Sequence, residues 1–138
     1  MSEMQMKAQI DAPADAVWGT VRDFGNPQKF IAAIEACTLE GSGVGAVRTL
    51  SLGSTTVVER LEALDDAARS LTYSIVSAPL PLEGYVATMR VRALGPDRCE
   101  VEWSCSFKPK GATEEEVKDI VRGVYAAGFA GLRKLHEG

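Results

Sequence analysis

A glutamate on the apolar face of a predicted strand is the residue of this chain that most strongly suggests chemistry. Strand alternation over residues 55–64 places Arg60 and Glu62 on one face, which their charges mark as the solvated one. Glu59 lies on the opposite face, whose other members are Val57, Leu61 and Ala63. A buried carboxylate without a partner is destabilising by several kcal/mol. The sequence therefore predicts either a buried cation beside Glu59 or an internal cavity that contains water or a ligand.

Glu59 has two interpretations that the sequence leaves open. In the first, it forms a structural ion pair with Arg48 or Arg90. Arg48 suits this role because its neighbours are uncharged and a guanidinium can hold a carboxylate through two hydrogen bonds. In the second, Glu59 lines a cavity as a polar anchor for a ligand or as a general acid or base, which makes it the candidate catalytic residue.

Two tyrosines join Glu59 on the predicted inner surface. Alternation places Tyr73 with Leu71 and Ile75, and Tyr85 on the inner face of the following strand. Both rings could be ordinary core packing, but a buried phenol needs a hydrogen-bond partner, which Glu59 or water would supply. Two phenols and a carboxylate in apolar surroundings are the usual composition of a ligand pocket.

Other polar features have simpler explanations. His136, the only histidine, lies near the end of the last predicted helix and would cap it in solvent. The glycine-rich segment 41–45 leads into a strand, so we interpret it as a hairpin turn and not as a phosphate loop. Cys37, Cys99 and Cys105 lack metal-ligand spacing and are expected to be free thiols. We therefore predict no metal site and no cofactor.

Length and composition predict one cytoplasmic globular domain over residues 1–138. Hydrophobic residues make up 46% and charged residues 25% of the chain, which is typical of a soluble protein with a packed core. The formal net charge of -4, with no basic block, argues against a nucleic-acid surface. Residues 1–10 do not resemble a signal peptide, and no segment is apolar over a length that would insert into a membrane.

The elements that must position these side chains follow in a clear order. Residues 4–10 predict a strand, residues 11–15 open a short helix, and Asn26–Pro27 open a second one. Alternating segments between turn residues then predict six antiparallel strands: 36–40, 46–52, 55–64, 70–77, 85–93 and 99–107. The last helix begins at the capping box Thr113–Glu116 and should pack against the concave side of the sheet. Its apolar stripe is Val117, Ile120, Val121, Val124, Gly128, Leu132 and Leu135.

This order predicts an α+β helix-grip fold, in which a curved antiparallel sheet of about seven strands wraps around a long C-terminal helix, with two short helices after the first strand. Segments 14–18, 43–48, 59–66 and 71–76 resemble the SRPBCC superfamily, which is START-related, and in particular its bacterial polyketide cyclase/dehydratase-like branch. More distantly, they are similar to the plant abscisic-acid receptors. The resemblance implies the helix-grip fold, whereas the superfamily includes binders, carriers and enzymes.

The resemblance also implies which residues line a cavity between the sheet and the terminal helix. By position they are Leu52, Glu59, Tyr73, Ile75, Leu82, Tyr85, Glu102, Ile120, Val124 and Gly128. Residues 50–55 would form a loop over the entrance, with residues 79–82 as its companion. Ile31 replaces the receptor lysine that binds the hormone's carboxylate, and Pro81 replaces an entrance-loop arginine. Abscisic-acid sensing is therefore not expected.

Strand alternation and the family resemblance place Glu102 on opposite faces of its predicted strand. Alternation over residues 99–107 puts Trp103 and Cys105 inside and Glu102 outside, whereas the resemblance puts Glu102 in the cavity. A bulge would reconcile them, or Trp103 would pack outside against the second subunit of a homodimer.

Three functions follow as hypotheses. The first is binding of a hydrophobic small molecule, lipid-like, polyketide or polycyclic, because the cavity carries few polar groups and no complete catalytic set. The second is a cyclase or dehydratase that uses Glu59, with Tyr73, Tyr85 or Glu102, to move protons on a polyketide. The third is a regulatory or assembly module that acts through the outer sheet face and exposes an apolar patch around Trp103.

Overall fold

A computed structural model describes residues 1–137 of the protein as seven strands, two α-helices and a single 3-10 turn. The strands are β1 (Ser2–Ile10), β2 (Ala36–Glu40), β3 (Val47–Leu52), β4 (Thr55–Asp65), β5 (Ser70–Ser77), β6 (Leu82–Gly95) and β7 (Arg98–Pro109). The helices are α1 (Ala14–Val21) and α2 (Glu114–His136), and the turn η1 covers Pro27–Lys29. The predicted helix-grip fold with a seven-stranded sheet is confirmed.

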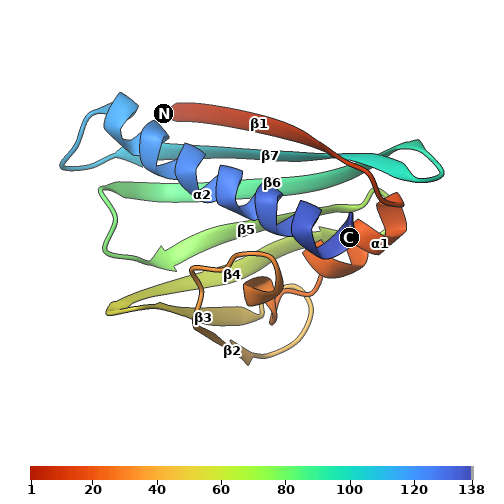
Figure 1. Ribbon diagram of the computed structural model, residues 1–138. Helices are drawn as coiled ribbons and strands as arrows, with labels where there is room; N and C mark the ends of the chain where they lie inside the picture. The colour runs from red at the N-terminus through yellow and green to blue at the C-terminus, as the bar shows by residue number, and fades with distance from the viewer. Residues whose placement is uncertain (138) are drawn as a thin grey trace.

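The strands form one antiparallel sheet in the order β1-β7-β6-β5-β4-β3-β2. Consecutive strands from β2 to β7 are neighbours, and β1 adds to the free edge of β7. Figure 1 shows α2 running obliquely across one face of this sheet, with α1 close to the C-terminal end of α2. The main core lies between that face and α2, where Val91, Val101 and Phe107 of the sheet meet Val117 and Leu132 of the helix. None of the helices in residues 1–137 is long and apolar enough to cross a membrane.

The capping box of α2 forms as predicted, but the buried stripe of the helix is rotated from the predicted one. Thr113 Oγ1 accepts a hydrogen bond from the Glu116 amide, and the Glu116 carboxylate accepts one from the Thr113 amide. Ile120 and Val124 remain 41% and 46% exposed, and Leu135 is exposed as well. The side chains that the helix buries are Val117, Val121, Tyr125, Gly128, Phe129 and Leu132.

The second short helix begins at Asn26–Pro27 as predicted, but it is only the three-residue 3-10 turn η1 and not an α-helix. Phe30 packs into the main core, whereas Ile34 packs into a second cluster with Leu50 and Val57. A continuous helix would place residues four apart on the same face. The two side chains instead pack into different clusters, in agreement with the irregular backbone between η1 and β2.

Strand β4 follows the predicted alternation only as far as Leu61. The burial of Val57, Glu59 and Leu61 agrees with the predicted inner face. The register between β4 and β5 then shifts between Leu61 and Ala63, which leaves Ala63 exposed and packs Leu64 against the core. The inner position predicted for Ala63 is wrong because one extra residue in a strand reverses the alternation.

Candidate functional site

A cavity of about 180 Å³ lies between the sheet, the segment that follows η1, and α2. Eight of the ten residues that the sequence suggested as cavity lining contribute to its wall: Leu52, Glu59, Tyr73, Ile75, Leu82, Tyr85, Ile120 and Val124. The remaining wall residues are Ile31, Ile34, Leu50, Thr55, Val57, Leu80 and Val121. The wall is therefore almost entirely aliphatic, with its polar atoms confined to a few side chains.

Some of the other wall residues carry a sequence signal. Leu50 alternates with Leu52, and Val57 alternates with Glu59, so a period of two applied to the whole of each strand finds both. Ile31 lies at the position of the receptor lysine. Residues 50–55 do not form the predicted entrance loop, because Leu52 ends β3 and only Gly53 and Ser54 separate it from β4.

Arg48 is the cationic partner of Glu59. The register of β3 on β4 places the two residues directly opposite each other. Nε of Arg48 donates to Oε1 of Glu59 at 2.8 Å, Nη2 lies 2.6 Å from the same oxygen in the ion pair, and Nη1 donates to the carbonyl oxygen of Phe24 at 3.2 Å. The pair is well buried, with Arg48 8% and Glu59 7% exposed. Glu59 therefore both forms a buried ion pair and lines the cavity.

The guanidinium of Arg48 also lies against aromatic rings. Its Cζ atom lies 4.0 Å from the ring centroid of Phe24 and 5.2 Å from that of Tyr73. Rings at these distances stabilise a desolvated cation through their quadrupoles. The hydrogen bond from Nε and the close contact with Nη2 both involve Oε1 of Glu59, so in the described part of the chain Oε2 remains available to a molecule in the cavity.

A chain of buried hydroxyl groups forms the second polar feature of the site. Trp103 Nε1 donates to Tyr73 Oη at 3.1 Å, Tyr73 Oη lies 3.4 Å from Tyr85 Oη, and Tyr85 Oη lies 2.5 Å from Tyr125 Oη. The Trp103 ring stacks on Tyr125, with centroids 4.0 Å apart. Tyr125 is not among the residues predicted from the sequence, although it follows Val121 by four residues on the buried side of α2.

Comparison with known proteins identifies the family. Residues 1–137 match the family described as polyketide cyclase / dehydrase and lipid transport. The chain belongs to this family. The family assignment agrees with the superfamily that the sequence motifs indicated, and two groups of relatives extend it.

The first group consists of abscisic acid receptors of Arabidopsis thaliana. The chain is 34% identical to receptor PYL2 over 125 residues, which cover 82% of this chain and 66% of the receptor. It is 31% identical to receptor PYL10 over 138 residues, which cover 93% of this chain and 75% of the receptor. The chain thus spans about two thirds of the length of PYL2.

The second group consists of solved bacterial structures. Protein XoxI from Bacillus cereus superimposes with a TM-score of 0.92 and 29% identity, covering 99% of this chain and 96% of the other. A protein from Thermobifida fusca superimposes with a TM-score of 0.88 and 30% identity, covering 96% and 91%. The helix-grip architecture of this family member is therefore shared with both.

Two residues suggested by the resemblance lie outside the cavity. Glu102 is on the outer face of β7, where it pairs with Lys7 at 3.9 Å, while its neighbour Trp103 is only 2% exposed on the inner face. The inward placement of Glu102 is therefore wrong, because β7 alternates without a bulge at this position. Gly128 faces the Trp103 ring, which would lie 2.6 Å from an added Cβ atom, so this glycine permits close packing of α2 and does not line the cavity.

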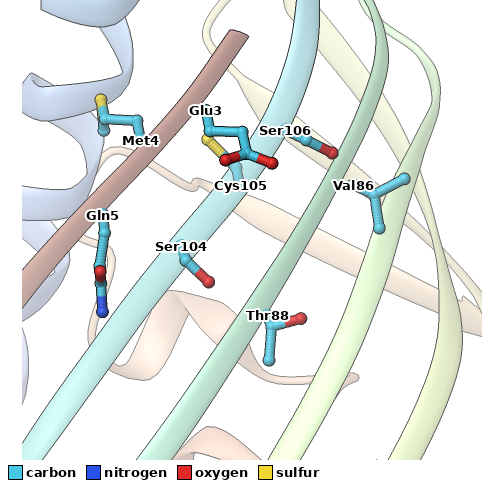
Figure 2. Close-up of a pocket in the computed structure, with 8 residues that line it drawn as sticks. All are labelled: Glu3, Met4, Gln5, Val86, Thr88, Ser104, Cys105 and Ser106. Atoms are coloured by element: carbon cyan, nitrogen blue, oxygen red, sulfur yellow. The ribbon is translucent and has the colours of Figure 1, made fainter. Parts of the chain in front are cut away.

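The outer face of the sheet carries a second hollow, of about 470 Å³. Figure 2 shows that its outer side chains are Glu3 and Gln5 of β1, Ser104 and Ser106 of β7, and Val86 and Thr88 of β6. The expected apolar patch around Trp103 is absent from this face, because Trp103 is buried under α2.

In residues 1–137 no three His, Cys, Asp or Glu side chains are grouped so as to hold a metal ion.

Alkaline titration should show that the three tyrosines do not ionise near pH 10 while the protein is folded. Burial is the main cause that raises the pKa of Tyr73, Tyr85 and Tyr125 above the ordinary value of about 10. A folded-state pKa above the unfolded value stabilises the fold fully below about pH 10, and this contribution is lost as the pH rises further. We expect phenolate absorbance to appear in one step together with loss of the circular dichroism signal. A gradual rise near pH 10 in folded protein would contradict the burial of the hydroxyl chain.

Proposed function

We propose that this protein binds a hydrophobic small molecule in the cavity between the sheet and α2. The observation that carries the proposal is the cavity itself, about 180 Å³ of space with an aliphatic wall. Well-packed cores contain few voids larger than a water molecule, so an apolar space of this size is typical of a ligand site. Ile120 and Val124 line the space and are also partly exposed, which is the arrangement expected of side chains at a mouth.

The polar groups of the wall support binding over proton transfer as the role of Glu59. Arg48 holds the carboxylate through a hydrogen bond and a close ion pair, as expected of a fixed anchor. The raised pKa values of Tyr73 and Tyr85 make these phenols poor proton donors at neutral pH. A cyclase or dehydratase reaction that uses Glu59 as general base is the second candidate, and the free Oε2 atom is the observation that favours it.

Abscisic acid is not the ligand that we propose. The relatives PYL2 and PYL10 are abscisic acid receptors by name, and they support a small molecule as the class of ligand. Ile31 lies in the cavity wall of this chain, where a cation would be needed to neutralise a carboxylate. We therefore expect a ligand without a carboxylate group.

Filling the cavity from α2 should abolish binding of an environment-sensitive lipophilic dye. In Val124→Trp an indole ring replaces the smaller side chain of a wall residue that is 46% exposed. We expect at least about a tenfold loss of dye affinity. Because the position is partly exposed, the unfolding midpoint should change little. The measurement is a fluorescence titration of the wild type and the variant.

The matched control is Ala126→Trp, which adds the same ring at an exposed position of α2 outside the cavity wall. This variant should bind the dye as the wild type does. Equal dye binding by wild type and Val124→Trp would place the dye elsewhere and would contradict the proposal.

A further inference from the structure

We propose that the ligand enters and leaves the cavity through the sheet, at a split between β5 and β6. This inference rests on the proposed ligand-binding function and assigns the route that the ligand takes. A continuous antiparallel sheet closes a cavity on one side, because the backbone hydrogen bonds between two strands would have to break before a molecule could pass between them. The strands β5 and β6 do not form this barrier along their whole length.

The hydrogen-bonded ladder between β5 and β6 ends before the strands do. β5 continues to Ser77 and β6 begins at Leu82, but within residues 1–137 the pairing of the two strands stops at Ser74 opposite Val86. Figure 1 shows β5 and β6 diverging toward the loop that joins them. Separation of the strands beyond this point therefore breaks no ladder.

An irregularity in each strand coincides with the split. On one side, the pairing of β5 with β4 passes over Val76, which has no opposite residue. On the other side, β6 has one residue more than β7 between Glu83 and Val86. Gly84 lies in this second irregularity with a φ of +63°, a conformation that favours glycine. Because bulges bend a strand and interrupt its pairing, the two irregularities explain why the ladder stops here.

Spaces on the two sides of the split share part of their walls. A hollow of about 250 Å³ is lined by residues 75–78 and residues 82–85. Three of these side chains, Ile75, Leu82 and Tyr85, also line the cavity. At this place the barrier between the cavity and the hollow is therefore formed by side chains and not by paired backbone.

Rotation of two aliphatic side chains is sufficient to connect the two spaces. Ile75 and Leu82 are only partly buried, and exposed side chains change rotamer rapidly compared with movements of the backbone. Tyr85 contacts the hydroxyl groups of Tyr73 and Tyr125, so it forms the fixed side of the passage. An apolar ligand passes between such side chains at little cost, whereas a charged one would lose its water there without gaining a partner.

The test is kinetic, because a route changes the rates of binding and not the equilibrium affinity. In Val76→Trp an indole ring is added at a residue that is 52% exposed, lines the hollow and is not part of the cavity wall. Stopped-flow fluorescence with an uncharged lipophilic dye should show that the association and dissociation rate constants both fall by about threefold or more, with an unchanged dissociation constant. Circular dichroism verifies that the variant folds.

The matched control is Leu94→Trp, which adds the same ring at an exposed residue of β6 outside both spaces. Its rate constants should equal those of the wild type. Unchanged rate constants in folded Val76→Trp would overturn the route. A higher dissociation constant with an unchanged association rate constant would also overturn it, because the hollow would then be part of the binding site. In both outcomes the dye still binds, so the proposed function stands, whereas failure of the wild type to bind the dye would overturn both.

Hydrogen exchange tests the split without any substitution. Backbone amides that face the split in residues 75–77 and 83–85 should exchange with deuterium faster than the paired amides of residues 71–74 and 86–89 in the same two strands. Equal protection of the two sets would show a continuous ladder and would overturn the proposed route.

Discussion

Arg48→Leu should lower the free energy of unfolding by about 3 to 5 kcal/mol, because it leaves the Glu59 carboxylate buried without a cation. Arg48 donates one hydrogen bond to Oε1 of Glu59 and another to the carbonyl oxygen of Phe24, and no other cation in residues 1–137 forms an ion pair with Glu59. Urea unfolding at neutral pH, followed by circular dichroism, measures the loss.

Two controls separate the unpaired charge from the loss of side-chain packing. The double variant Arg48→Leu with Glu59→Leu removes both charges and should recover much of the stability, because an apolar pair avoids the desolvation of both ions. Arg60→Leu on the same strand as Glu59 breaks an exposed ion pair with Glu62 and should change stability far less. A single Arg48 variant no less stable than the double variant would contradict the proposed coupling.

Gly131→Ala should destabilise the protein by about 1 to 3 kcal/mol or more, although alanine is the better helix former. A Cβ atom at Gly131 would lie 1.7 Å from the carbonyl oxygen of Phe30 and 2.6 Å from its carbonyl carbon. Both atoms belong to the backbone, so either α2 or the segment after η1 must move. Because Ile31 of that segment lines the cavity, ligand binding should weaken together with stability.

Gly123→Ala provides the matched comparison within the same helix. No heavy atom lies within 4 Å of the Cβ position at Gly123, so the substitution only replaces a poor helix former by a good one. We expect it to stabilise the protein by about 0.5 to 1 kcal/mol. Thermal unfolding of both variants is the measurement, and equal midpoints would contradict the close approach of Phe30 to α2.

The sequence determined the seven strands, the helices α1 and α2, and the inner position of Glu59. Alternation depends on neighbouring residues of one strand, and the capping box of α2 depends on residues three apart, so both can be recognised without knowledge of the fold. Alternation also correctly assigned Trp103 to the inner face of β7. The family resemblance, in contrast, placed its neighbour Glu102 on that face, and this placement is wrong.

Only the tertiary structure decided which partners these residues meet. The sequence offers Arg48 and Arg90 as partners of Glu59 and favours Arg48, but the choice depends on strand register, which places Arg48 opposite Glu59 and Arg90 opposite Glu102. The rotation of α2 that buries Tyr125 and leaves Val124 at the cavity is likewise set by the facing side chains of the sheet, above all Trp103. Strand register and the rotation of a helix depend on contacts between segments far apart in the chain. Local residue patterns therefore do not predict them.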